Sequence, residues 1–166
     1  VWRTAGGGPV IGVSECTWGL LDGMNADGLA VCLAVGGRRI VGKGFGIPLV
    51  VRYLLETCET VAEACETVST LPVHMTFSLT MVDASGQCAT VHLSPDRDAI
   101  VTSEATCTNH QLGPEWPEYA IASRTEERKD RLDTPVFYTH LRAHDTVLDL
   151  VCRLLLEKKK ERAKLI

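Results

Sequence analysis

Asn109, within Thr108-Asn109-His110, is the residue of this sequence best suited to catalytic chemistry. Its side-chain amide donates hydrogen bonds without titrating, which suits a group that must stabilise a developing oxyanion. Asparagine is also common in loops and turns, and Asn109 lies shortly before Pro114. The local pattern therefore offers an oxyanion donor and leaves open a purely structural turn residue.

A second asparagine, Asn25, lies in the tetrapeptide Asn25-Ala26-Asp27-Gly28 between two apolar runs. These runs predict strands over residues 18–23 and 28–35, joined as a hairpin at the Gly-bearing corner. Asn-x-Asp-Gly is also an ordinary turn sequence, so the pattern alone gives Asn25 no chemical role.

Helices and further strands must position these residues. Pro48 predicts the start of an amphipathic helix. Thr60 predicts the cap of a second helix over residues 61–71, with Glu63 completing a capping box and Pro72 ending the helix. The remaining patterns predict strands over residues 75–82, 88–93 and 99–102 and a helix over residues 117–132. This order of elements predicts an α+β fold with stacked layers.

The overall composition argues against several classes of function. The 166 residues are 45% hydrophobic with a net charge of −4, which fits a globular domain with a substantial core. The acidic balance argues against nucleic acid as a partner, since phosphate binding needs a clustered basic face. The longest apolar runs, residues 47–55 and 147–156, are too short to span a bilayer, so we expect no membrane partner.

The seven cysteines are scattered along the chain without Cys-x-x-Cys pairs. An odd number cannot close entirely into intramolecular disulfides, which favours free thiols and a cytoplasmic location. Cys58 and Cys65 form the nearest pair and have no histidine beside them, so the spacing predicts no metal site. The glycine-rich residues 42–46 lack the spacing and the Lys-Ser/Thr end of a P-loop, and we expect no cofactor.

Charge divides the chain near residue 133. Residues 1–133 carry a net charge of −7, whereas residues 134–166 carry +3. The later segment, with its run from Tyr138 to Lys160, resembles translated sequencing-adapter tails on metagenomic protein fragments. We therefore expect a domain over residues 1–133 and a tail over residues 134–166 that is either non-native or a peripheral amphipathic helix.

Several segments resemble, in the same order, N-terminal-nucleophile cysteine amidohydrolases of the penicillin acyltransferase-like and choloylglycine hydrolase-like kind. The segments are Gly23-Met24-Asn25, Gly28-Leu29-Ala30-Val31, Pro48 to Glu56, Thr60 to Ala64, Asp83-Ala84-Ser85-Gly86, Thr108-Asn109-His110 and Thr125 to Leu132. Each segment alone is a weak signal, but the shared order is fairly specific. The resemblance covers residues 15–132 and does not extend to the tail.

The resemblance implies an αββα sandwich, in which two β-sheets lie between helical layers, with this chain lacking the N-terminal part. In that family a precursor cleaves itself to expose an N-terminal cysteine, whose thiolate attacks an amide or thioester carbonyl. The freed α-amino group can act as the base, since its ordinary pKa is about 8. Water or an acceptor amine then takes the acyl group from the acyl-enzyme. We expect the nucleophile upstream of Val1, so that this chain alone is inactive.

The resemblance also assigns three candidate catalytic residues. Asn109 matches the oxyanion donor, and Asn25 matches a second active-site asparagine. Arg128 matches an arginine that favours the thiolate form of the nucleophile, with a solvated helix arginine as the alternative. These enzymes need no general base, which favours packing or hydrogen bonding for His110. Cys16 is not expected to be the nucleophile, because it lies only nine residues before Asn25.

The predicted function is therefore that of a fragment of a cysteine amidohydrolase or acyltransferase. Its partner would be a small-molecule substrate with a linear amide C–N bond or an acyl thioester. Two alternatives stay open: a noncatalytic binding or scaffold domain of the same fold, and an unrelated α+β domain with coincident motifs. Sheet edges exposed by missing strands would allow a homo-oligomer.

Overall fold

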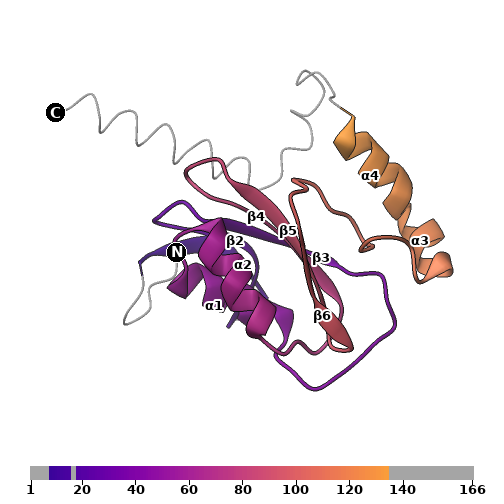
Figure 1. The fold of residues 1–166 in the computed structure, drawn as a ribbon, viewed down its shortest axis with the longest axis horizontal. Coiled ribbons are helices and arrows are strands. Elements are labelled where there is room, and N and C mark those ends of the chain that lie inside the picture. Colours follow the sequence, from indigo (N-terminus) through magenta and orange to yellow (C-terminus); the bar gives the residue numbers. More distant parts are fainter. Residues whose placement is uncertain (1–7, 16–17, 135–166) are drawn as a thin grey trace. The chain divides into compact units, whose positions relative to one another are not determined.

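The structure is a computed structural model that describes residues 8–15 and 18–134 (Figure 1). Six strands form one antiparallel sheet whose spatial order follows the sequence. The strands are β1 (Val10–Glu15), β2 (Gly19–Asn25), β3 (Ala30–Val35), β4 (Phe77–Val82), β5 (Cys88–Ser94) and β6 (Arg97–Thr102). The helices are α1 (Ile47–Thr57) and α2 (Val61–Thr70), between β3 and β4, and α3 (Pro117–Ser123) and α4 (Thr125–Asp133), after β6. The sheet is therefore a meander with one helical insertion.

Helices α1 and α2 cover one face of the sheet, and the hydrophobic core lies between them and the strands (Figure 1). Alternate strand residues point to this face, as in the cross-strand pairs Val31↔Met81 and Leu79↔Val91. The helices contribute buried aliphatic side chains such as Leu54. Their apolar spacing, with Pro48 at the start of α1, places one stripe of each helix on the sheet.

The opposite face of β4 and β5 is polar. Ser78 pairs with His92 across the two strands, with 2.9 Å between the Ser78 hydroxyl and His92 Nδ1. Thr80 pairs in the same way with Thr90, and their hydroxyl oxygens are 2.9 Å apart. The segment after β6 lies against this face, since the Thr90 hydroxyl donates to the Glu104 carbonyl at 2.8 Å. The polar face is therefore the side of the sheet on which Asn109 lies.

The hairpin predicted around Asn25 is confirmed as β2 and β3, with Gly28 at φ 96° in its corner. The cap predicted at Thr60 is also confirmed, because the Thr60 hydroxyl accepts from the Glu63 N–H at 3.3 Å. The return bond of the capping box differs. The Glu63 carboxylate accepts from the Glu59 N–H at 2.9 Å instead of from Thr60.

Two parts of the fold differ from the sequence prediction. Strand β1 was not predicted, because its residues lack a clear alternation and most are exposed at the edge of the sheet. The single helix predicted over residues 117–132 was wrong in its continuity, since α3 ends and α4 begins at Arg124. Arg124 has a left-handed backbone with φ 51°, which a continuous right-handed helix does not allow.

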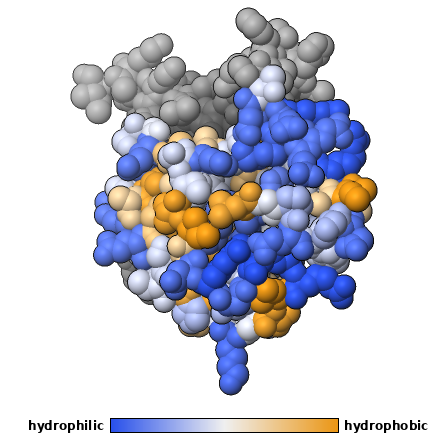
Figure 2. Space-filling view, turned by 45° about the vertical axis from the view of Figure 1, so that its right-hand side comes forward, coloured by the Kyte–Doolittle hydropathy of each residue, from blue (hydrophilic) through white to orange (hydrophobic). Residues whose placement is uncertain are grey.

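The α+β class is confirmed, with one six-stranded sheet in the described residues. The longest described helix, α1, has 11 residues and would extend about 17 Å, short of a bilayer core of about 30 Å. The face in Figure 2 is mostly hydrophilic, with hydrophobic residues in separate patches. The predicted tail over residues 134–166, apart from Thr134, lies outside the described residues, so the predicted domain boundary stays a prediction.

Candidate functional site

The structure brings Asn109 and Arg128 together. One Nη atom of Arg128 donates to Asn109 Oδ1 at 2.8 Å and also approaches the Ser123 carbonyl at 3.4 Å. A guanidinium can only donate, so the side-chain amide of Asn109 must turn its oxygen toward Arg128. The Nδ2 group then points away, and within residues 8–15 and 18–134 it has no hydrogen-bond partner. Asn109 therefore presents a free, oriented N–H donor.

Helix α4 holds the main chain on both sides of Asn109. The Thr108 hydroxyl donates to the Thr125 carbonyl at 2.9 Å. His110 Nδ1 lies 2.9 Å from the Thr125 hydroxyl, so His110 serves as a hydrogen-bonding residue here. Thr125 is fully buried at the start of α4, immediately after the left-handed Arg124. These contacts fix the distance from Asn109 to the next turn of the helix, which carries Arg128.

The loop after β3 meets Asn109 from the opposite side. Gly37 has φ 65°, and a Cβ atom at this position would collide with the Asn109 carbonyl oxygen. Only glycine combines this backbone conformation with so close an approach. Gly37 therefore places the loop directly against the main chain of Asn109.

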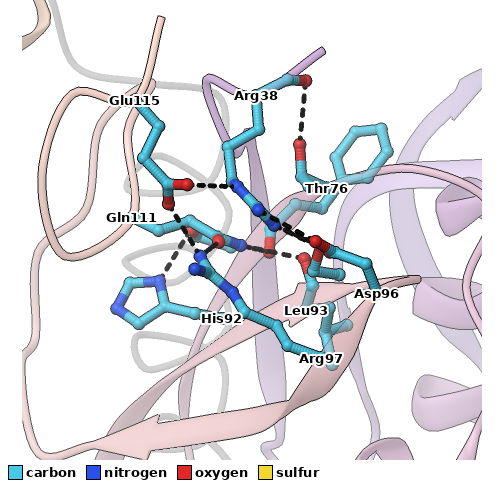
Figure 3. Close-up of polar contacts among 11 residues, drawn as sticks. Arg38, Thr76, His92, Leu93, Asp96, Arg97, Gln111 and Glu115 are labelled. Atoms are coloured by element: carbon cyan, nitrogen blue, oxygen red, sulfur yellow. Dashed lines mark hydrogen bonds and ion pairs between the residues drawn. The ribbon is translucent and has the colours of Figure 1, made fainter. Parts of the chain in front are cut away.

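Gln111 fastens the same segment to the end of the β4–β5 pair (Figure 3). Its Nε2 donates to the Phe77 carbonyl at 3.1 Å and to the Leu93 carbonyl at 2.8 Å. Its Oε1 accepts from Arg97. Because Gln111 is buried and its amide is bonded through both atoms, it is a fixed anchor two residues from Asn109.

Arg38 joins three segments in one ion-pair network (Figure 3). Its guanidinium donates to both carboxylate oxygens of Asp96, at 2.8 and 3.0 Å, and to Glu115 at 2.7 Å. Arg97 also contacts Glu115, at 3.1 Å. Hydrogen bonding to Arg38 holds the pKa of Asp96 well below its ordinary value, and the bond to Asp96 raises the pKa of Arg38. The Arg38–Asp96 ion pair therefore stays charged over the whole physiological pH range.

None of these network residues was predicted from the sequence. Arg38 and Asp96 are 58 positions apart, and Gln111 is 34 positions from Phe77. The available signal was the glycine pair followed by two arginines after an expected strand, which indicates a close backbone approach near charge. That signal does not identify the partners.

Asn25 lies at the other end of β3. Its Nδ2 donates to the carbonyls of Cys58 at 2.7 Å and Leu55 at 3.3 Å. Its Oδ1 accepts from the N–H groups of Leu29 at 3.0 Å and Asp27 at 3.1 Å. Strand β3 separates this turn from Gly37 and Asn109 by roughly 17 Å, at about 3.3 Å per residue. The predicted active-site role of Asn25 stays a prediction, and its observed contacts tie the hairpin to α1.

Two of the described cysteines, Cys65 and Cys107, are poor candidates for an activated thiol. Cys32, Cys58, Cys65, Cys88 and Cys107 are free of disulfides. Burial raises the pKa of the Cys65 and Cys107 thiols, which disfavours the reactive thiolate. Cys16 lies outside the described residues. Within the described part of the chain, no three His, Cys, Asp or Glu side chains gather as a metal ion would require.

Comparison with known proteins identifies the family. A profile of acyl-coenzyme A:6-aminopenicillanic acid acyl-transferases matches residues 4–161. The chain belongs to this family. The family resemblance predicted from the order of motifs is therefore confirmed, and the match continues through most of the segment after residue 133. No similar sequence was found among curated proteins.

Two solved structures are similar to this acyl-transferase family member. One is a variant of conjugated bile acid hydrolase from Clostridium perfringens, with a TM-score of 0.49 and 16% identity over 71% of this chain. The other is penicillin V acylase from Agrobacterium tumefaciens, with a TM-score of 0.43 and 22% identity over 76% of this chain. In each case the similarity covers 42% of the other protein, so this chain spans less than half of their length.

Proposed function

We propose that this chain is the oxyanion-binding part of a cysteine amidohydrolase or acyltransferase that acts on linear amide C–N bonds or acyl thioesters. The observation that carries the proposal is the Arg128–Asn109 pair, at 2.8 Å, in a chain of the acyl-transferase family. Arg128 holds the oxygen of the Asn109 amide, which leaves the Nδ2 donor for a substrate oxygen. The family to which the chain belongs is one of acyl-transferases, which supports this choice of reaction class.

The reaction proceeds through an acyl-enzyme. A cysteine thiolate adds to the substrate carbonyl carbon, and the carbonyl electron pair moves to oxygen, where Asn109 Nδ2 donates to it. Collapse of this intermediate breaks the C–N or C–S bond, and the leaving group departs as amine or thiol with the proton that the α-amino group took from the cysteine thiol. Water or an acceptor amine then attacks the thioester and frees the cysteine. Hydrolase and acyltransferase differ only in this acceptor.

The nucleophile lies outside residues 1–166 in this proposal. Burial raises the pKa of the Cys65 and Cys107 thiols, which argues against these two residues as the nucleophile.

The decisive experiment is single-turnover release of amine from an activated amide, with a protein that includes the upstream cysteine. Asn109→Ala should slow acyl-enzyme formation by about a hundredfold or more, the typical loss for one oxyanion donor. Asn109→Asp should be at least as damaging, since it replaces a donor with a charge that repels the oxyanion. Circular dichroism should show unchanged secondary structure in both variants.

Arg128 acts through Asn109 in this proposal, and a double-mutant cycle tests that link. Arg128→Ala should slow the reaction by about tenfold, because the Asn109 amide is then free to rotate. Adding Arg128→Ala to Asn109→Ala should lower the rate little further, because the amide that Arg128 orients is already absent. Near-normal rates in both Asn109 variants would remove Asn109 from the mechanism and favour a noncatalytic scaffold domain.

A further inference from the structure

Arg38 and Arg39 are neighbours in the loop after β3, but they use their charges differently. The Arg38 guanidinium is bound to Asp96 and Glu115, and only 10% of its side chain is exposed. Arg39 is exposed, and no ion pair joins it to a carboxylate within the described ranges 8–15 and 18–134. Its guanidinium instead lies over the Trp116 ring, 5.2 Å from the ring centroid. One arginine is therefore committed to the fold, and the other keeps its hydrogen-bond donors available.

The contact with Trp116 orients Arg39 without using its N–H groups. A cation over an aromatic face is attracted by the ring quadrupole, whereas the five N–H donors of a guanidinium lie at its edges. Trp116 itself stacks on Tyr119, with 4.9 Å between the ring centroids and 21° between the ring planes. The two rings form a base that limits the rotamers of Arg39. This arrangement suits bidentate binding of a carboxylate.

The ion-pair network sets this arginine beside Asn109. Arg38 pairs with Glu115 at 2.7 Å, so Arg39 and Trp116 are the next residues along two segments that are already joined. Gly37, two positions before Arg39, packs against the Asn109 carbonyl oxygen. Two residues of chain span at most about 7 Å, so the backbone of Arg39 lies close to that of Asn109.

We propose that Arg39, oriented by Trp116, binds the carboxylate of the amide or thioester substrate whose carbonyl oxygen meets Asn109. The identification of this ligand as substrate rests on the proposed function, whereas binding itself does not. Arg39 is a specificity-determining residue in this proposal, and the substrate class is amides that carry one negative charge near the scissile bond. The carboxylate belongs to either the amine half or the acyl half of the substrate, and the two arms of the binding test separate these cases.

One neighbouring acid, Glu118, opposes the binding of an anion. Asp96 and Glu115 are balanced by Arg38 and Arg97, whereas Glu118 in the first turn of α3 is exposed and belongs to none of these ion pairs. Its negative charge near Tyr119 and Trp116 opposes a bound anion. Glu118→Gln should therefore tighten carboxylate binding, by about twofold to threefold at low salt.

Binding of small amides by this 166-residue chain tests the proposal without any catalysis. Ligand-observed NMR titrations would compare N-benzoylglycine, with the carboxylate in its amine half, and N-phenylsuccinamate, with the carboxylate in its acyl half. N-benzoylglycinamide is the neutral probe. We expect one carboxylate probe to bind about tenfold or more tightly than the neutral one, and Arg39→Gln to abolish that difference. Arg39→Lys should keep part of it, because the charge remains and the planar fork is lost.

Lys43 supplies the matched control, since it is an exposed cation in the same loop and lines a different, polar pocket of about 240 Å³. Lys43→Gln should leave both dissociation constants within about twofold of the wild-type values. Equal binding of charged and neutral probes, or equal losses in Arg39→Gln and Lys43→Gln, would overturn the proposal. An unchanged KM for the carboxylate substrate in Arg39→Gln of the active protein would do the same.

The failure of this inference is distinguishable from failure of the proposed function. The protein that includes the upstream cysteine could bind a carboxylate through Arg39 and yet fail to cleave amides. That result would refute the proposed reaction and support the anion site. Amide cleavage that requires Asn109 but does not depend on Arg39 would support the proposed reaction and refute the anion site.

Discussion

Asn25 and Asn109 carry the same side-chain amide in different surroundings. The Asn25 amide is buried and bonded at both atoms, including donation to the carbonyls of Leu55 and Cys58. Asn109 has its oxygen on Arg128 and its Nδ2 group unpaired within the described residues. A donor committed to a buried carbonyl cannot serve an oxyanion without leaving that carbonyl unsatisfied, which is costly. We infer that the hydrogen bonds of Asn25 stabilise the fold and that the Nδ2 donor of Asn109 is the one available to a substrate oxygen.

Stability measurements should separate the two asparagines. Asn25→Ala should lower the free energy of unfolding by about 2 kcal/mol or more, because the Leu55 and Cys58 carbonyls lose a buried donor. The matched variant Asn109→Ala should change it by less than about 1 kcal/mol, since Asn109 is only partly buried and its partner Arg128 is exposed. Urea denaturation of both variants gives the comparison. A fully stable Asn25→Ala protein would show that these hydrogen bonds contribute little to the stability of the fold.

At the scale of elements, the break between α3 and α4 decides where Arg128 lies. Arg124 adopts a left-handed conformation that costs a non-glycine residue about 1–2 kcal/mol. The cost is offset by Thr125, whose carbonyl and hydroxyl are bound by Thr108 and His110. The break therefore turns α4 so that Arg128 reaches Asn109.

Substitutions at Arg124 should report this strain. Both Arg124→Gly and Arg124→Ala remove the exposed ion pair with Glu127, but only glycine adopts φ 51° freely. Arg124→Gly should therefore be more stable than Arg124→Ala by about 1 kcal/mol in thermal or urea unfolding. Equal stability of the two variants would mean that α3 and α4 form one continuous helix in solution.

The sequence correctly predicted the elements whose determining residues lie within a few positions of one another in the chain. Gly28 supplies the positive φ of the hairpin corner, and the Thr60 hydroxyl caps the N–H three residues later. The break at Arg124 has no such signal, because the contacts that stabilise it come from Thr108 and His110. The candidate site follows the same rule. Asn109 stands out by residue type, whereas its supports are set by pairing across the sheet, which a local pattern does not contain.

At the scale of the whole molecule, hydrogen bonds within the described residues hold the C-terminal end of helix α4. Helix α4 finishes with the Thr134 N–H donating to the Asp130 carbonyl at 3.0 Å. Asp133 is bound by Lys129 at 2.6 Å and by the Thr106 hydroxyl. Within the described residues, every buried side-chain nitrogen and oxygen has a hydrogen-bond partner. No buried side-chain polar atom of the described residues therefore needs a later segment as its partner, although the family match continues to residue 161.

Removing residues 135–166 should consequently change the melting temperature by less than about 2 °C, which corresponds to well under 1 kcal/mol for a domain of this size. Truncation after Ser123 is the matched control. It removes the buried Thr125 and the Lys129–Glu104 ion pair and should lower the melting temperature by about 10 °C or prevent folding. Circular dichroism melts of the full chain and both truncated chains make the comparison. The chain that ends at Thr134 could instead lose nearly as much stability as the chain that ends at Ser123. That result would show that residues 135–166 pack as a native part of the fold, in agreement with the family match to residue 161.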